Sequence, residues 1–368
     1  MVSPTSNEAR TIGIRERLGE LCYNTGLLNP LQKMRAWWQK DLRILAYHRV
    51  MPVPDPDQYE FDMELISTTP EEFREQMLLI KERYRPMRLT DVAAAIAAGD
   101  ALPPDAVVIT FDDGYDDNYR IVYPILKELG VPATFFISTG HIDSGRPYAY
   151  DWLVHMILLA KADRLTLPEL GMDVPMPATR AERRELAGNV LDHMKEISAI
   201  TQAAMIQRLE REWRMPSDHA YPADCRPMNW DQLREMRAAG LEIGSHGVNH
   251  WMLSKLPREE LEREVFDSRN ALLRELGPMS LLMSYPVGSN RAFDQQVIDV
   301  TRDAGFDLAC SYISGTNLQP AANRYSLYRI AVERYYGKAW FAALLTLPGL
   351  IGYPTPAHLA TTDESCSH

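Results

Sequence analysis

Two adjacent carboxylates, Asp112 and Asp113, stand directly after a run of apolar, β-prone residues at positions 106–111. Gly114 allows a sharp turn, and residues 116–119 provide capping and first-turn residues for a helix. The pattern therefore predicts a buried strand, an acidic tip and a helix. Two carboxylates at the end of such a strand repel each other and lose hydration, and a bound cation would remove this penalty. Alternatively, both are solvated residues of a loop and a helix cap.

A second strand end carries two histidines. Residues 241–245 form a short, β-prone segment, and His246 and His250 follow it four positions apart. If a helix or tight turn begins between them, both rings lie on one side, at a spacing that suits a shared metal ion. Two histidines and one carboxylate make a plausible three-ligand zinc site with an open position for water, and the second carboxylate is then free to act as a base. By itself the histidine pair is a weak signal, because surface pairs at this spacing are common.

Three segments together resemble the motifs of the polysaccharide deacetylase family, carbohydrate esterase family four. They are Thr-Phe-Asp-Asp-Gly at 110–114, Ser-His-Gly-Val-Asn-His at 245–250 and Ser-Tyr-Pro-Val-Gly at 284–288, in family order. The resemblance covers roughly residues 42–335. It implies a distorted, incomplete (β/α) barrel and metal-dependent removal of acetyl groups from carbohydrates. An early Tyr-His pair, ending in His48, resembles the permuted subgroup that deacetylates poly-N-acetylglucosamine.

The alternation of strand and helix patterns independently predicts an α/β fold with a parallel sheet, and seven or eight strand candidates suit a closed barrel. The polar residues of the three motifs and His48 all follow strands, so a barrel would bring them to one face. We expect a helical extension at 1–41, a barrel at 42–335 with a helical insertion at about 143–228, and a C-terminal helix and tail at 336–368.

The resemblance also implies roles for single residues. Asp113, His246 and His250 hold the metal ion. Asp112 is the general base that deprotonates the attacking water. The backbone N–H of Val287, which follows the proline of the third motif, stabilises the oxyanion. Many relatives have an aromatic residue where this chain has valine, so a wall of the substrate pocket differs here.

Two further roles rest on departures from the common family pattern. No histidine follows a late strand, so His48 is our candidate for the general acid that protonates the leaving amine; the alternative is a buried, hydrogen-bonded residue at a strand end. Ser284 stands where an arginine often braces the base. Arg329, on the last predicted strand, is our candidate for that brace, although strand arginines more often form structural salt bridges.

Three aromatic residues are candidates for contacts with the sugar: Tyr115, Trp230 and Tyr285. Trp230 could equally pack in the core. The divalent metal ion best suited to two histidines and an aspartate is Zn²⁺, and Co²⁺ or Ni²⁺ would bind the same ligands.

Composition limits the partners and the location. The net charge of −11 argues against nucleic-acid binding through a general basic surface. Neither a basic-then-apolar leader nor an apolar run of transmembrane length is present, so we expect a cytoplasmic protein. The helical pattern at 8–40 is basic and amphipathic. We expect these helices to pack on the domain, and together with the C-terminal helix they are also compatible with peripheral contact at the inner membrane face.

The sequence thus predicts a metal-dependent hydrolase that removes N-acetyl groups from amino-sugar units of a polysaccharide or of its lipid-linked precursor. Two alternatives stay open. One is a catalytically silent relative that binds carbohydrate. The other is an enzyme that hydrolyses an O-acetyl group or a non-sugar amide at the same site.

Overall fold

The computed structural model describes residues 14–38, 40–216 and 220–351 of the 368-residue chain. The predicted extension and tail therefore lie in part, at 1–13 and 352–368, outside the described residues. Among the described helices, none is both long enough and apolar enough to cross a membrane.

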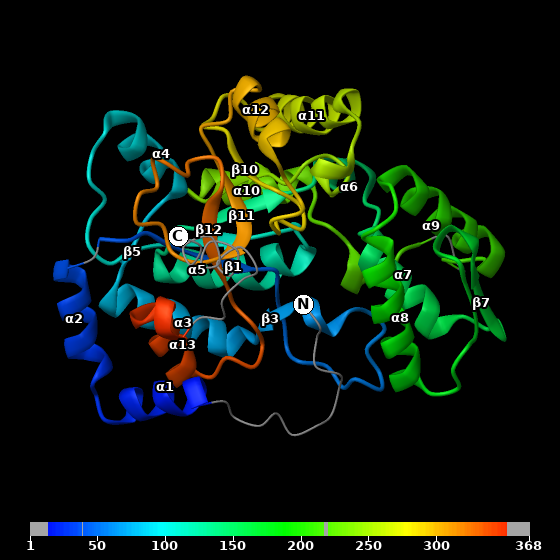
Figure 1. Ribbon diagram of the computed structural model, residues 1–368, viewed down its shortest axis with the longest axis horizontal. Coiled ribbons are helices and arrows are strands. Elements are labelled where there is room, and N and C mark those ends of the chain that lie inside the picture. The colour runs from blue at the N-terminus through cyan, green and yellow to red at the C-terminus, as the bar shows by residue number, and fades with distance from the viewer. Residues whose placement is uncertain (1–13, 39, 217–219, 352–368) are drawn as a thin grey trace, which may run out of the picture.

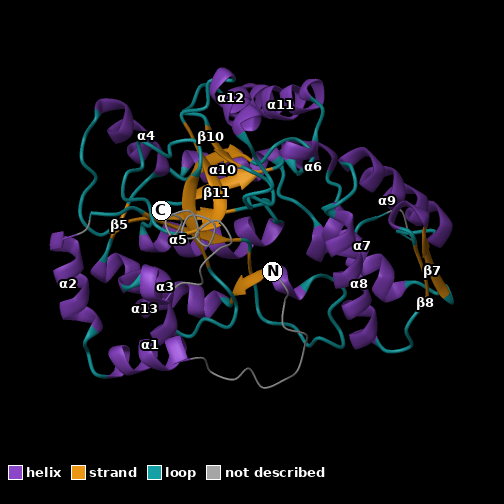
Figure 2. Ribbon diagram, in the orientation of Figure 1, coloured by secondary structure: helices purple, strands orange, loops and turns teal. Residues whose placement is uncertain are grey.

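A ring of seven parallel strands forms the centre of the fold (Figures 1 and 2). In spatial order the strands are β1 (Arg43–Tyr47), β12 (Leu327–Ala331), β11 (Leu308–Ser314), β10 (Leu282–Ser284), β9 (Glu242–Ser245), β6 (Thr134–Ile137) and β5 (Ala106–Phe111). Five register pairs between β5 and β1 close the ring. The short β4 (Arg85–Pro86) pairs with the start of β5 outside the ring. The predicted α/β barrel of seven or eight strands is confirmed.

Helices surround the ring and cover its outer face (Figure 1). Those that connect ring strands are α3 (Pro70–Arg83), α4 (Leu89–Ala98), α5 (Tyr123–Leu129), α6 (Thr139–Ser144), α10 (Trp230–Ala238), α11 (Arg258–Leu276) and α12 (Gln295–Asp303). A π-helical turn, Asn118–Val122, precedes α5, and the 3₁₀ turns η1 (Met63–Leu65) and η5 (Leu253–Lys255) lie in connecting loops. Two short strands, β2 (Arg49–Val50) and β3 (Ile66–Thr68), pair with each other beside β1. Thr69 caps α3 through a capping box with Glu72.

The segment between β6 and β9 leaves the barrel and builds a layer of its own. It contains α7 (Ala149–Leu159), α8 (Arg180–Met194) and α9 (Ala199–Trp213), with the 3₁₀ turns Pro168–Leu170 and Ala223–Cys225. A separate hydrophobic cluster, centred on Trp152, Met156 and Ile157, holds these helices together. The sequence predicted the helices but not the antiparallel hairpin of β7 (Arg164–Leu167) and β8 (Met172–Pro175), which lies at the far edge of the layer (Figure 2).

The two ends of the described chain meet on one side of the barrel. The helices α1 (Ile14–Asn24) and α2 (Leu28–Trp38) contact α13 (Lys338–Thr346), which is followed by α14 (Pro348–Ile351). Most side chains of α13 are buried, because α1, α2 and α3 all pack against it (Figure 1). The terminal helices therefore pack on the domain, as the sequence pattern favoured.

Candidate metal centre and active site

Residues that follow different ring strands line one cavity of about 140 Å³. Because the strands are parallel, their carboxyl ends share one face of the barrel, and the loops that follow them meet there. The cavity is lined by His48, Leu65, Asp112, Asp113, Tyr150, His246, His250, Tyr285, Val287 and Tyr312. The predicted convergence on one face is thus seen in the structure.

Asp113, His246 and His250 form a compact group of three ligand atoms within 4.8 Å of one another. Oδ1 of Asp113 lies 3.6 Å from Nε2 of His246 and 3.3 Å from Nε2 of His250. This buried oxygen accepts no hydrogen bond among the described residues. An unpartnered buried carboxylate oxygen facing two ring nitrogens fits the donor set of a divalent metal ion.

Hydrogen bonds orient the ligands of this group. Nδ1 of His246 lies 2.7 Å from the carbonyl oxygen of Ser284, a contact that requires Nδ1 to carry the proton and leaves Nε2 free. Burial lowers the pKa of His246 to about 4, which favours the neutral ring. Burial alone would raise the pKa of Asp113, but His250 and the other nearby histidines lower it, and the net shift is downward. Both shifts favour the protonation states of metal ligands.

Tyr150 and Tyr148, at the start of α7, hold Asp113 from the side of the insertion. The Tyr150 phenol donates a 2.7 Å hydrogen bond to Oδ2 of Asp113, and the Tyr148 phenol donates to its carbonyl oxygen. The rings of Tyr148 and Tyr150 lie 5.4 and 5.2 Å from the ring of His250. Neither tyrosine was predicted from the sequence, because no motif or periodicity marks them.

Asp112 faces the same cavity but has different partners. Its two carboxylate oxygens accept hydrogen bonds from Nη1 and Nη2 of Arg329, at 2.8 and 2.6 Å. Arg329 also donates to Ser284 Oγ and to the carbonyl oxygen of Ser311. Burial alone would raise the pKa of Asp112. The positive charge of Arg329 and the nearby His246 lower it by more, so the pKa lies below its usual value. The carboxylate is therefore kept ionised and fixed in direction.

Backbone strain is concentrated around the cavity. Five non-glycine residues in the described chain have positive φ, and Asp113, His250 and Val287 are three of them, with φ of 72°, 58° and 64°. Such a conformation is costly, above all for a β-branched residue, and is typical of functional sites. No described residue accepts a hydrogen bond from the Val287 N–H. Gly288 follows, and a Cβ there would lie 2.5 Å from the backbone nitrogen of Tyr312, so only glycine fits this turn.

His48 borders the cavity beside Tyr312, with ring centroids 5.4 Å apart. Its backbone is held on both sides. The N–H donates to Ser67 Oγ at 2.9 Å, and the carbonyl oxygen accepts from Asn118 Nδ2 at 2.9 Å. No described residue accepts a hydrogen bond from the imidazole of His48 or donates one to it.

The three aromatic candidates for sugar contacts lie in different places. Tyr285 borders the cavity, although its phenol donates to the carbonyl oxygen of Tyr325. Tyr115 is buried behind the site under the guanidinium of Arg49. Trp230 donates from Nε1 to Asp143 and packs against the barrel core. Neither Tyr115 nor Trp230 lines the 140 Å³ cavity.

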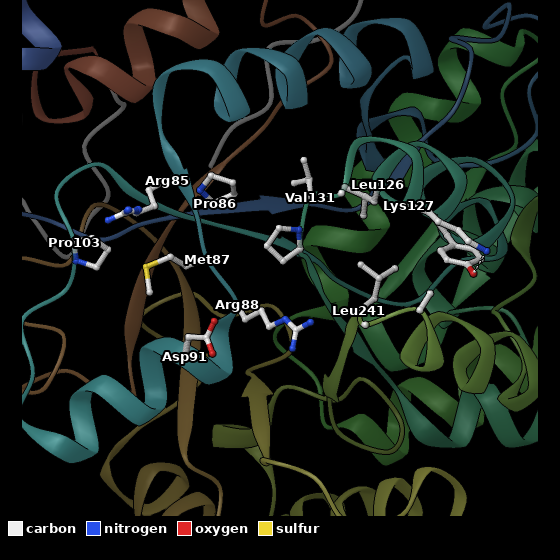
Figure 3. Close-up of a pocket in the computed structure, with 15 residues that line it drawn as sticks. Arg85, Pro86, Met87, Arg88, Asp91, Pro103, Leu126, Lys127, Val131 and Leu241 are labelled. Carbon is white, nitrogen blue, oxygen red and sulfur yellow. Dashed lines mark hydrogen bonds between the residues drawn. The ribbon is translucent and has the colours of Figure 1, made fainter.

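A larger hollow of about 620 Å³ lies elsewhere (Figure 3). It is bordered by Arg85 and Arg88, by Lys127 of α5, and by residues that precede β6 and β9. These residues mark the amino-terminal ends of the strands, whereas the ligand group lies at their carboxyl ends. None of the residues around the metal centre borders this hollow.

A family model described as polysaccharide deacetylase matches residues 99–309. This chain belongs to the polysaccharide deacetylase family. The match includes Asp112, Asp113, His246 and His250, together with Val287. The match begins after His48 and ends before Arg329, so it does not include these two residues.

Curated relatives of this deacetylase-family chain are distant. It is 21% identical over 259 residues to "Putative polysaccharide deacetylase YxkH" of Bacillus subtilis, which covers 69% of this chain and 61% of that protein. It is 37% identical over 75 residues to poly-beta-1,6-N-acetyl-D-glucosamine N-deacetylase of Escherichia coli, which covers 20% of this chain and 11% of that protein. The chain thus spans less than two thirds of either relative.

Solved structures share the fold. The Streptococcus pyogenes deacetylase PplD, in complex with acetate, matches with a TM-score of 0.53 at 18% identity, over 81% of this chain and 95% of that one. IcaB from Ammonifex degensii matches with a TM-score of 0.51 at 18% identity, over 83% and 96% of the two chains. At this identity the likeness shows the fold alone.

Proposed function

We propose that this protein is a metal-dependent hydrolase that removes N-acetyl groups from amino-sugar units of a polysaccharide or of a lipid-linked glycan precursor. The observation that carries the proposal is that two neighbouring aspartates in one cavity have different partners. Asp113 turns an unpartnered oxygen toward two histidines, while Asp112 is held by Arg329 in the same cavity. Family membership and the poly-N-acetylglucosamine deacetylase among the relatives support this substrate class.

The metal ion would be held by Asp113, His246 and His250. When bound there, a divalent cation acts as a Lewis acid and lowers the pKa of water. Two imidazoles and one carboxylate suit Zn²⁺ best, and Co²⁺ or Ni²⁺ are alternatives for the same ligands. Tyr150 keeps the second oxygen of Asp113 turned away from the two histidines.

The other residues of the cavity would each have a separate role in the reaction. Asp112, ionised and aimed by Arg329, accepts the proton of the attacking water. His48 donates a proton to the amine nitrogen as the bond between carbon and nitrogen breaks. The Val287 N–H, which has no acceptor among the described residues, donates to the oxyanion of the tetrahedral intermediate. Tyr285 borders the space for the sugar.

The test combines metal analysis with acetate release from N-acetylglucosamine oligomers, for the wild type and for Asp113→Ala. We expect one metal ion per wild-type chain and acetate release that disappears, together with the metal, in the variant. Bound metal without acetate release would contradict N-acetylglucosamine oligomers as the substrate, and O-acetylated sugars would then be the next substrates to test. Absence of both metal and activity after addition of zinc or cobalt would contradict the proposal and favour a silent, carbohydrate-binding relative.

We propose the same domain limits as the sequence indicated: a helical extension to residue 41, a barrel at 42–335 with the insertion at about 143–228, and a C-terminal segment from 336. The contacts of α1 and α2 with α13 support treating both ends as one packed unit.

We also propose that α1 and α2 contact a membrane surface. Twelve large apolar side chains are exposed in the described chain, and six of them lie between residues 18 and 38. Trp37 and Trp38 are 79% and 77% exposed. Lysines and arginines outnumber acidic residues by six to three within residues 1–40, although the whole chain has a net charge of −11. Exposed tryptophans beside basic residues suit an anionic lipid interface.

Sedimentation with phosphatidylglycerol vesicles tests this surface. We expect the wild type to bind and the double variant Trp37→Ser, Trp38→Ser to remain free, whereas Leu318→Ser, at an exposed leucine elsewhere, should bind normally. Equal sedimentation of all three proteins would contradict the proposal. A wild type that dimerises and ignores vesicles would assign the surface to a second copy of the chain.

A further inference from the structure

A groove of about 300 Å³ opens directly beside the metal centre. Tyr150, His250 and Val287 line both this groove and the 140 Å³ cavity, so the two spaces adjoin. One wall comes from the insertion helices α8 and α9, and the other from the loop that follows His250. A molecule whose acetamido group reaches the centre can therefore extend into the groove.

Apolar side chains dominate the walls of this groove. The chief ones are Leu191, Met194, Ile197, Ala203, Trp251 and Met252. Sugar rings present hydroxyl groups that need hydrogen-bonding partners. The two side-chain amides of the lining already donate elsewhere, Gln202 to the carbonyl oxygens of Met194 and Ile197 and Asn249 to Glu264. An alkyl or prenyl chain needs no hydrogen-bonding partner, and each methylene that leaves water adds to affinity.

The charged residues of the groove are mostly cationic. Lys195 and Lys255 line it, and both are exposed. Lys195, directly after α8, pairs with Asp192 of that helix at 2.7 Å, whereas Lys255 makes no ion pair with a described residue. The only acidic residue of the lining is Asp62, and its Oδ1 already accepts the N–H of Glu64 at 2.9 Å. Two lysines beside an apolar wall are complementary to a phosphate group attached to an apolar chain.

We propose that the groove binds the phosphate linker and the apolar chain of a lipid-linked N-acetylated sugar. The inference rests on the proposed deacetylase function and narrows its substrate from polymer to amphiphilic precursor. The insertion, which supplies α8 and α9, then determines specificity, while the barrel supplies the chemistry.

The first experiment compares two synthetic ligands that have no amide to cleave, glucose 1-(decyl phosphate) and glucose 1-(methyl phosphate). Calorimetry measures their dissociation constants without any catalytic step. A buried methylene contributes roughly a fourfold gain, so we expect the decyl compound to bind at least about tenfold more tightly. Equal affinities would overturn the proposal, and so would a failure of both compounds to bind.

Variants locate the effect. Ala203→Trp fills the groove and should abolish the preference for the decyl chain, and Ala203→Leu should reduce it. Ala204→Trp is the matched control, because Ala204 is the next residue of α9, is exposed and does not line the groove. Lys255→Gln should weaken both phosphodiesters about equally, whereas Lys161→Gln, at an exposed lysine away from the groove, should not. A preference that survives both Ala203 variants would place the chain elsewhere and contradict the proposal.

Acetate release then separates the two levels of inference. N-Acetylglucosamine 1-(decyl phosphate) should have a kcat/KM at least about tenfold above that of the methyl compound in the wild type, and a ratio near one in Ala203→Trp. Acetate release at equal rates from both compounds would contradict the proposed role of the groove but would support the proposed deacetylase function. If neither compound releases acetate but the decyl compound still binds more tightly, the proposed deacetylase function would be contradicted and the proposed binding role of the groove would be supported.

Discussion

The phenol of Tyr150 donates a 2.7 Å hydrogen bond to Oδ2 of Asp113 and thereby connects the insertion to the candidate metal centre. Oδ1 of the same carboxylate faces His246 and His250 and has no donor in the described chain. The two oxygens of one side chain thus have separate tasks. The hydrogen bond fixes the rotation of the carboxylate, which decides whether Oδ1 points at the histidines.

Removing this hydrogen bond should weaken metal binding without unfolding the protein. We expect Tyr150→Phe to lower the affinity for Zn²⁺ by about 10- to 100-fold, the usual effect of losing a residue that orients a metal ligand. Competition with a chelator measures the affinity. Tyr221→Phe, at a tyrosine of the insertion that contacts Trp152, is the control and should bind zinc normally. Unchanged zinc affinity in Tyr150→Phe would show that Asp113 is positioned by other contacts.

The contact between Arg329 and Asp112 can be changed in hydrogen-bond geometry without changing the charge. Arg329→Lys keeps a cation but loses the planar pair of donors that contacts both oxygens of Asp112. We expect kcat to fall by about 10- to 100-fold, because a misdirected base is a poor proton acceptor, while the metal content stays at the wild-type level. Arg43→Lys is the matched control, because Arg43 is equally buried but pairs with Asp41 and Asp105. Equal losses in the two variants would mean that only stability is affected.

The parts of the candidate centre that lie next to strands could be predicted from the sequence. Asp112, Asp113 and His246 follow short apolar runs, and the rule that parallel strands end on one face places them together. Arg329 was predicted on a different ground: Ser284 stands where relatives often have the bracing arginine, and Arg329, within the last predicted strand, was the candidate to replace it. Strand ends are predictable because local pattern and barrel topology lead to the same place.

Residues whose position depends on long-range packing were not predictable. Tyr150 is 37 positions from Asp113, in an insertion whose path over the barrel no periodicity reveals. For Trp230 the sequence left two alternatives open, a pocket wall or core packing. An aromatic residue at the start of a helix can face a pocket or the core, and here its ring packs on the core while Nε1 donates to Asp143. The hairpin β7–β8 was not predicted either, because its strands are four residues each and lie among helical patterns.

The proposed acid role of His48 predicts a dependence on the leaving group. A departing amine needs a proton, whereas 4-nitrophenolate leaves readily without one. We therefore expect His48→Gln to lower kcat for an N-acetylated sugar by about 10²- to 10⁴-fold and to leave the hydrolysis of 4-nitrophenyl acetate nearly unchanged. Metal analysis should show a full site, since His48 is outside the ligand group. Equal losses on both substrates would instead indicate a structural role at the end of β1.

Asp151 predicts a pH dependence of stability that is separate from catalysis. This buried carboxyl accepts the N–H of Asp62 at 2.8 Å and the phenol of Tyr115 at 3.3 Å. Burial raises its pKa to about 7, although Arg49 opposes the rise. An unfolded aspartate has a pKa of about 3.9. Between about pH 4 and 7 the folded protein therefore binds a proton that the unfolded chain releases, so this residue makes the free energy of unfolding fall as the pH rises.

Asp151→Asn removes this titrating group and should therefore change how the free energy of unfolding varies with pH. Relative to the wild type, we expect the free energy of unfolding of the variant to rise by about 1 to 3 kcal/mol between pH 5 and pH 8. Chemical denaturation at each pH measures it, and Asp163→Asn, at an exposed aspartate of the insertion, should show no such trend. Parallel curves for Asp151→Asn and the wild type would mean that Asp151 is ionised throughout this range. Its contact with Arg49, 3.9 Å away, would then outweigh the cost of burial.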